Sequence, residues 1–340
     1  MSIRQHDIAQ QLGLSVSTVS LALRDDPQIS EATRHQVRHT ATKLGYSYRP
    51  RQASRVDIQQ IAFITIFELS DQFYSGVLKG AVEACQRHEI ALQYSPLKKQ
   101  TLDDPLLEKL TPQMLKQLSE SDALLLVGAI DKEVVMRLAG LGRPLVLVDN
   151  NVMSTGLDRV LIENTASLYH TVMQLAQSGH ERIAFFRGPE ITSSSFRDRW
   201  WGYHAAMTEL GLEPIEMICG EASIVSAEQT MADWLDIHKQ PSFTAIIGCN
   251  DQVAIGAMHA LQHHGLRVPT DVAIIGFDDI DVAHSVRPTL TTHRVEREAL
   301  GALGVRRLIE RVKQPEEPSI TLMLEPLLIE RNSARLTQLT

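Results

Sequence analysis

The chain has 340 residues, enough for two or three domains with substantial cores, and its formal net charge of −8 excludes a protein coated in basic surface. Charge is uneven, however, because residues 1–60 hold eight Lys or Arg and five Asp or Glu, a net +3, which leaves −11 for the rest. Three widely separated cysteines argue against a disulfide framework or a structural zinc site, and no stretch approaches the roughly 18 apolar residues of a membrane span. We therefore expect a cytoplasmic protein that binds nucleic acid at one end and does not bind a membrane.

The first predicted elements are two short helices. Residues 7–12 form one helical segment, a glycine supplies the turn, and Ser15 caps a second helix. On that second helix Val16, Val19 and Leu23 are spaced to share one face. Two helices joined in this way are typical of a helix-turn-helix, whose second helix fits the major groove of DNA, although an ordinary helical hairpin with a polar outer face is the alternative.

A third helix is predicted over residues 30–44, followed by a glycine stop signal. Its residues Thr33, Val37, Ala41 and Leu44 are spaced to close a three-helix core. The sequence therefore predicts a small all-helical headpiece over residues 1–45.

The run DIAQQLGLSVSTVSLAL, followed by ISEATRHQV and TKLGY, resembles the DNA-binding headpiece of the LacI–GalR family of bacterial repressors. The resemblance implies that the recognition helix begins at residues 15–18, that Val16 and Ser17 face base edges, and that Thr18 and Ser20 bind phosphates. The full set implied to contact DNA in the headpiece is Ser15, Val16, Ser17, Thr18, Ser20 and Leu21. Leu21 departs from the family pattern, where Arg is common, and Leu offers only apolar contact, for example with a thymine methyl group.

Residues 46–60 lack the helical spacing of apolar residues and place Arg49, Arg51 and Arg55 around a proline. This composition predicts a basic linker, which is either a solvated tether or a hinge. In the family, the hinge becomes helical on DNA and inserts an apolar wedge into the minor groove. The resemblance places that wedge near Arg55 or Val56, and neither residue is the usual Leu.

From residue 61 apolar strands alternate with helices, which predicts an α/β fold of two doubly wound parallel-sheet units of the periplasmic-binding-protein-like type I. The predicted strands are 61–67, 90–94, 123–128, 144–149, 182–186, 215–219, 244–248 and 272–277. The predicted helices are 73–88, 105–119, 131–139, 164–178, 196–210, 226–238 and 250–264. A strand at 289–293, a helix at 296–312 and one or two strands within 320–330 follow. The expected subdomains are 61–160 plus 290–318, and 161–289 plus 319–331.

Polar side chains follow several predicted strands. Asp149, Asn250 and Asp278 come at or just after strand ends, Arg199 lies near the start of a helix, and Phe73 opens the first helix of the core. Ligands of open α/β sheets bind beyond the carboxyl ends of the strands, and carboxylates, an amide, a guanidinium and an aromatic ring suit a hydroxyl-rich ligand. The alternative for Asn250 and Asp278 is simple helix capping.

The runs PLVLVD, FRDRWWGY, CNDQVAIGAM and IIGFDD are similar to the family's periplasmic-binding-protein-like core over nearly all of residues 61–331. The resemblance implies effector contacts at Asp149, Arg199, Asn250 and Asp278, flanked by Phe73. Ser193 and Ser195 are further candidates. Residues 221–230 lack an aromatic that some sugar-binding members carry, and Trp200 is a candidate substitute. The implied effector is a sugar or sugar derivative, with a purine as the alternative.

Signs of catalysis are weak. The chain has no GxSxG, GxGxxG or GxxxxGK motif in the required context, and the pairs His35/His39 and His259/His263 lack the Glu of HExxH. Asp278 and Asp279 have no nucleophile beside them, so we expect no enzyme, no cofactor and no metal site.

The predicted function is therefore a ligand-responsive regulator that binds a palindromic operator in double-stranded DNA as a homodimer. The alternatives are a solute-binding module whose DNA binding has decayed and a sugar-modifying enzyme on the same core. The predicted helix 73–88, with its small residues Gly76, Gly80, Ala81 and Ala84, is a candidate dimer contact whose alternative is simple packing on its own sheet.

Overall fold

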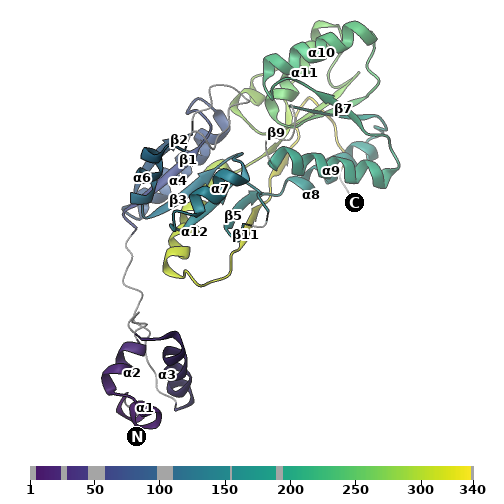
Figure 1. Cartoon of the computed structure of the whole chain (residues 1–340). Helices are drawn as coiled ribbons and strands as arrows, with labels where there is room; N and C mark the ends of the chain where they lie inside the picture. Colours follow the sequence, from purple (N-terminus) through teal and green to yellow (C-terminus); the bar gives the residue numbers. More distant parts are fainter. Residues whose placement is uncertain are drawn as a thin grey trace. The chain divides into compact units, whose positions relative to one another are not determined.

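The computed structural model describes residues 5–23, 29–44, 58–97, 110–153, 155–188 and 194–337. The chain divides into two compact units, Met1–Asp57 and Ile58–Thr340 (Figure 1). No helix in the described part of the chain is both long enough and apolar enough to cross a lipid bilayer.

The described residues of the first unit form three helices, α1 (Gln5–Leu12), α2 (Val16–Leu23) and α3 (Glu31–Lys43). Their inward faces form a small apolar core made of Ile8, Ala9, Val19, Ala22, Leu23, Val37 and Ala41. The spacing argument placed Val16 on the same face as Val19 and was wrong there, because Val16 is 43% exposed whereas Val19 is fully buried. Val16 is the first residue of α2, where no preceding helical turn covers it.

The second unit contains two six-stranded sheets. The first sheet has the order β11-β5-β4-β3-β1-β2, and all of its pairings are parallel. Its strands are β1 (Gln60–Thr65), β2 (Ala91–Pro96), β3 (Ala123–Val127), β4 (Leu145–Val148), β5 (Asp158–Ile162) and β11 (Thr321–Leu324). Alternate side chains of the central strands pack with α4 (Gln72–Arg87) and α12 (Arg297–Lys313) on one face, and with α6 (Pro112–Glu120) and α7 (Lys132–Ala139) on the other.

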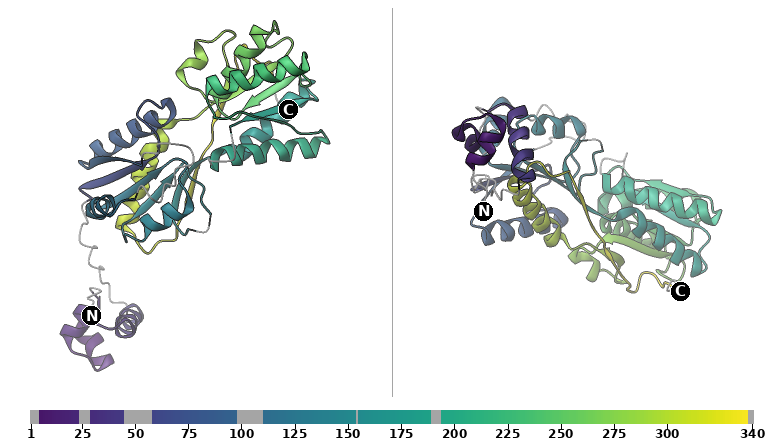
Figure 2. Two further views of the ribbon diagram at one scale, coloured as in Figure 1. Left: turned by 45° about the horizontal axis from the view of Figure 1, so that its top comes forward. Right: turned by 90° about the horizontal axis from the view of Figure 1, so that it is seen from below.

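The second sheet has the order β12-β10-β9-β8-β6-β7 and is parallel except where β12 pairs with β10. Its strands are β6 (Ile183–Arg187), β7 (Ile215–Ile218), β8 (Ala245–Gly248), β9 (Ala273–Asp278), β10 (Thr291–Arg294) and β12 (Leu327–Ile329). Helices α8 (Asn164–Gln177) and α9 (Ser194–Leu210) pack together, as do α10 (Ile224–His238) and α11 (Asp251–His263), and the two pairs lie on opposite sides of this sheet (Figures 1 and 2). A short 3₁₀ helix, η1 (Asp281–His284), follows β9.

The predicted α/β architecture of two parallel sheets with covering helices is confirmed, but the expected subdomain boundaries need correction at the tail. β10, expected in the first subdomain with 290–318, pairs with β9 in the second sheet. β11, expected in the second subdomain with 319–331, pairs with β5 in the first sheet, while β12 pairs with β10 in the second.

Side-chain contacts explain where the two tail strands go. Asp158, the first residue of β5, accepts hydrogen bonds from Arg311 Nε at 2.7 Å and from the backbone N–H of Ile320 at 2.8 Å, which holds the approach to β11 beside β5. The Ser333 hydroxyl donates to the Ile274 carbonyl at 2.6 Å, which holds the segment after β12 on the second sheet. The chain therefore passes between the two sheets three times, after β5, after β10 and after β11.

The small residues of α4 pack against α12 within the same chain. A Cβ at Gly80 would lie 1.9 Å from the Glu298 carbonyl oxygen, and a Cβ at Gly301 would lie 1.9 Å from the Val77 carbonyl oxygen. Backbone contact at this distance requires glycine on both helices. The small face of α4 that we considered for a dimer contact is thus accounted for by packing within the chain.

Candidate functional site

The exposed part of α2 is its first turn. The Ser15 hydroxyl caps the helix by accepting from the Thr18 N–H at 2.9 Å, as predicted. Ser15, Val16 and Ser17 are exposed, and Thr18, Ser20 and Leu21 are half-buried around them. The first turn of the second helix is the part of a helix-turn-helix that reads base edges. The hinge candidates Arg55 and Val56 lie outside the described residues.

In the core, the carboxylate of Asp149 lies where β4 ends. It is 3% exposed and accepts a hydrogen bond at Oδ2 from the Tyr74 hydroxyl of α4 at 2.7 Å and another at Oδ1 from the Ser195 hydroxyl of α9. Burial raises the pKa of Asp149, and the hydrogen bonds from Ser195 and Tyr74 oppose that rise. Asp149 therefore joins residues from both subdomains.

Arg199 lies in the second turn of α9 and is only 2% exposed. Its Nε donates to Asn164 Oδ1 at 2.8 Å, its Nη1 donates to the Cys249 carbonyl at 2.5 Å, and its Nη2 donates to Asp278 Oδ1 at 3.3 Å. Its guanidinium carbon lies 3.6 Å from the centre of the Phe277 ring. These contacts fix the plane of the guanidinium group.

Asp278 is the last residue of β9 and is 9% exposed. Burial raises its pKa to about 7; the positive charge of Arg199 opposes this rise, while the negative charges of Asp149 and Asp71 add to it. Asp278 and Asp149 also have positive φ angles, 113° and 52°, which are uncommon for residues other than glycine. Backbone strain of this kind at strand ends is often retained at binding sites.

The other predicted contacts lie around this centre. Asn250 accepts from the Val253 N–H at 2.9 Å and so caps α11, which is the capping role considered from the sequence. Phe73 is 9% exposed and meets Tyr74 edge-on, with ring centroids 4.9 Å apart. Ser193 lies outside the described residues. The structure thus groups Asp149, Arg199 and Asp278. Phe73 packs on Tyr74, which donates to Asp149, and Asn250 follows Cys249, whose carbonyl accepts from Arg199.

Sequence reasoning missed Tyr74 and misplaced Trp200. Tyr74 has the spacing of an ordinary helical residue, yet its ring stacks on Phe67 at 3.7 Å and its hydroxyl reaches Asp149. Trp200 instead packs against His204 with the two rings tilted by 47° and their centroids 4.1 Å apart. Phe196 of α9 lies closer to this site, with its ring centre 5.6 Å from the Arg199 guanidinium carbon.

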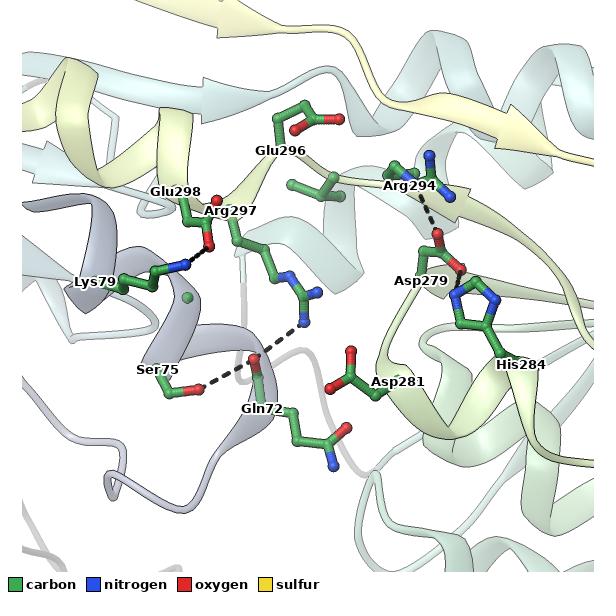
Figure 3. Close-up of a pocket in the computed structure, with 12 residues that line it drawn as sticks. Gln72, Ser75, Lys79, Asp279, Asp281, His284, Arg294, Glu296, Arg297 and Glu298 are labelled. Atoms are coloured by element: carbon green, nitrogen blue, oxygen red, sulfur yellow. Dashed lines mark hydrogen bonds and ion pairs between the residues drawn. The ribbon is translucent and has the colours of Figure 1, made fainter.

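A pocket of about 550 Å³ lies beside this junction (Figure 3). It is lined by Gln72, Ser75, Gly76 and Lys79 of α4, by Asp279, Asp281 and His284 around η1, and by residues 294–298, which run from the end of β10 into the start of α12. Arg297 extends across it to the Gln72 carbonyl at 3.1 Å, and Arg294 donates to Asp279 at 2.7 Å. The pocket therefore draws residues from both subdomains, although Asp149, Arg199 and Asp278 do not line it.

Among the described residues, no group of three or more His, Cys, Asp or Glu side chains could hold a metal ion. The pair His259 and His263 instead faces one carboxylate, Glu228, at 3.4 and 3.3 Å. These histidines thus have a partner on the neighbouring helix.

The chain joins a three-helix unit with an exposed helix start to a two-sheet core whose strand ends hold buried polar groups. This combination is typical of a DNA-binding regulator with a ligand-sensing body. Residues 5–48 match the model of bacterial regulatory proteins of the lacI family, and residues 172–334 match the periplasmic binding protein-like domain. The ribose operon repressor of Haemophilus influenzae is 28% identical over 96% of this chain and 97% of that protein. The repressor CytR of Escherichia coli is 27% identical over 97% of this chain and 95% of that protein.

Solved structures agree on the fold. The lac repressor dimer bound to operator and the anti-inducer ONPF is similar with a TM-score of 0.72 and 23% identity, over 98% of this chain and 99% of that chain. A regulator from Enterococcus faecium with bound ribose has a TM-score of 0.70 and 21% identity, over 82% of this chain and 100% of that chain. The chain belongs to the lacI family of bacterial transcriptional regulators, and its relatives are regulators, not enzymes.

Proposed function

We propose that this protein binds a palindromic operator as a homodimer and that a small sugar, held at the junction of the two core subdomains, changes its affinity for that operator. The observation that carries the proposal is the pairing, in one chain, of an exposed recognition-helix start with Asp149, Arg199 and Asp278 at the strand ends of the core. Because it acts on DNA, we place the protein in the bacterial cytoplasm.

The DNA-reading role rests on the exposed face of α2. Val16 and Ser17 are exposed and do not pack in the three-helix core, so their side chains can contact base edges in the major groove. Thr18 and Ser20 offer hydroxyls at the margin of that face, where phosphates would lie. Two such units are needed for a palindrome because each reads one half-site.

The sugar-binding role rests on the chemistry of the junction. Asp149 and Asp278 are hydrogen-bond acceptors for hydroxyls, Arg199 is held in a fixed plane, and Phe73 and Phe196 offer apolar ring surface nearby. Proteins with this fold include one described with bound ribose and one described as a complex with cellobiose. These contacts come from both subdomains, so a ligand there would favour one angle between them and shift the population of DNA-binding dimers.

The test is a gel-mobility assay with full-length protein and the DNA upstream of its own gene, at low salt, with and without candidate sugars. Binding to a palindrome that weakens steeply as salt rises is expected, because phosphate contacts release counterions. No binding to any palindrome at low salt would contradict the proposal and favour a solute-binding module with decayed DNA binding.

A further inference from the structure

The contact between α4 and α12 changes along the length of the two helices (Figure 1). At Gly80 and Gly301 the two backbones touch, so that no side chain fits between them. Further along both helices, alanines replace the glycines and a pocket of about 200 Å³ opens between the helices. Its lining residues are Ala84, Arg87, His88, Ala302 and Arg306.

The polar side chains of this pocket are all basic, and all are exposed. Arg87 and His88 lie at the end of α4, where the helix dipole favours cations, so their presence there needs no ligand. The dipole does not explain Arg306, because this residue lies in the interior of α12. The pocket therefore gathers cations from two helices, and the end of one helix explains only part of the set.

The carboxylates of these two helices are paired with other cations. Lys79 of α4 donates to Glu298 of α12 at 2.7 Å. Glu310, one turn after Arg306, pairs with Arg307 at 3.3 Å. Within the described part of the chain, no carboxylate pairs with the basic side chains of the pocket. The pocket thus has at least two positive charges without an acidic partner.

Two guanidinium groups that line one small pocket suit a phosphoryl group. A guanidinium donates two parallel hydrogen bonds to phosphate oxygens, and an imidazole N–H offers a further donor. Pockets for drug-sized ligands measure roughly 300–1,000 Å³, so this smaller one fits a phosphoryl group with a few carbon atoms and excludes a whole nucleotide. The methyl groups of Ala84 and Ala302 offer apolar surface to those carbon atoms.

We propose that the pocket formed by Arg87, His88 and Arg306 binds the phosphoryl group of a small phosphate monoester. This is a second ligand site, because none of its lining residues belongs to the group around Asp149 or lines the larger pocket beside that group. A phosphate held by both arginines joins α4 to α12. The proposal is independent of the sugar response and goes beyond it.

Isothermal titration of the full-length protein with glycerol 3-phosphate tests this site, at a constant ionic strength of about 0.15 M to screen general attraction between exposed charges. Inorganic phosphate and uncharged glycerol are the comparison probes. Both phosphates should bind at millimolar concentration, because the phosphoryl group makes the main contacts, and glycerol should not bind. No binding of either phosphate, or equal binding of glycerol, would overturn the proposal.

Variants locate the binding. Arg306→Gln and Arg87→Gln should each weaken the binding of glycerol 3-phosphate about tenfold or more, because each removes hydrogen bonds to a charged group. The matched control is Arg137→Gln, at an exposed arginine in the last turn of α7 on the other face of the first sheet, and it should leave that affinity unchanged. All three positions are exposed, so the Tm without ligand should match that of wild type. Wild-type affinity in Arg306→Gln would overturn the assignment, as would an equal loss in Arg137→Gln.

Discussion

The Ser195 hydroxyl of α9 donates to Asp149 at the end of β4, so a side chain of one subdomain is bonded to the strand end of the other. Asn151, two residues further on, reinforces this link: its N–H donates to the Ser194 hydroxyl at 2.8 Å, and its side-chain amide donates to Asp198 at 2.9 Å. Hydrogen bonds therefore join the start of α9, the helix that carries Arg199, to residues 149–151 after β4.

Ser195→Ala tests whether the hydrogen bond between Ser195 and Asp149 stabilises the fold. The change leaves one oxygen of a buried carboxylate without its donor, and we expect the free energy of unfolding to fall by about 1–3 kcal/mol. Urea denaturation measures it. Ser70→Ala, at an exposed serine, is the matched control and should change stability by less than about 0.5 kcal/mol. If both variants lowered the free energy of unfolding equally, the Ser195–Asp149 hydrogen bond would not be stabilising.

Arg199→Ala is expected to remove the response to sugar and to lower stability by about 3–5 kcal/mol, because Asp278 would remain buried without its cation. Operator binding should persist at temperatures where the variant is folded. Arg182→Ala, which removes an exposed guanidinium bonded to the Ser242 carbonyl, should affect neither property. A full sugar response in folded Arg199→Ala would show that the ligand binds elsewhere.

The raised pKa of Asp278 predicts a pH dependence of stability. Folding raises this pKa from its ordinary value of 3.8 to about 7, so between those pH values the folded chain holds a proton that the unfolded chain has released. Stability from this group is therefore present in acid and is lost as pH rises toward 7. Asp149 and Asp251 act in the same direction, since burial raises their pKa values too.

Asp278→Asn should therefore reduce the loss of stability between about pH 5 and about pH 7.5, measured by urea unfolding at each pH. His293 opposes the trend in wild type and variant alike, because burial lowers its pKa to about 3 and stability is lost as pH falls below its ordinary value of 6.5. Parallel pH profiles for wild type and Asp278→Asn would refute the assignment.

Gly80→Ala should destabilise the core by about 1–3 kcal/mol, because the new Cβ would meet the Glu298 carbonyl of α12 and the two helices would have to separate. Gly76→Ala on the same helix is the control: its Cβ would lie 3.0 Å from the Arg297 Cβ, a much smaller overlap than the 1.9 Å approach to a backbone oxygen at Gly80, so a smaller loss of stability is expected. Thermal unfolding distinguishes the two. If Gly80→Ala were neutral in stability, the α4–α12 contact would be looser than the structure shows.

Val16 and Val19 permit the same substitution at an exposed and a buried position of one helix. Val19→Ala should lower the free energy of unfolding of the three-helix unit by about 1–3 kcal/mol. Val16→Ala should leave that free energy unchanged and weaken operator binding by about 1–3 kcal/mol. Circular dichroism and anisotropy of labelled operator DNA measure the two effects. Unaltered operator affinity in Val16→Ala would remove this residue from the DNA contact.

Much of the fold was predictable because strands and helices of the core have clear periods. β5 was not predicted, because its short DRVLI run follows a polar loop and carries a charge at its first two positions. The sheet that receives each tail strand was also unpredictable, because it depends on the contacts of Asp158 and Ser333 with residues far away in the sequence.

The site shows the same limit. Asp149 and Asp278 were predictable because strand ends are positions where ligands bind in α/β sheets. Tyr74 was not, because its role comes from a hydroxyl that meets Asp149 across 75 positions of sequence. The packing of Phe277 between Arg199 and His293 likewise brings together β9, α9 and β10, which no local pattern indicates.

The central claim is that a ligand at the Asp149–Asp278 junction controls a DNA-reading headpiece. The most direct measurement is the affinity of full-length protein for its upstream palindrome, titrated with the candidate sugar that most raises the Tm of the protein. We predict tight binding at low salt and a change in operator affinity of about fivefold or more as the sugar saturates. An operator affinity that stays constant while the sugar demonstrably saturates the core would contradict the claim.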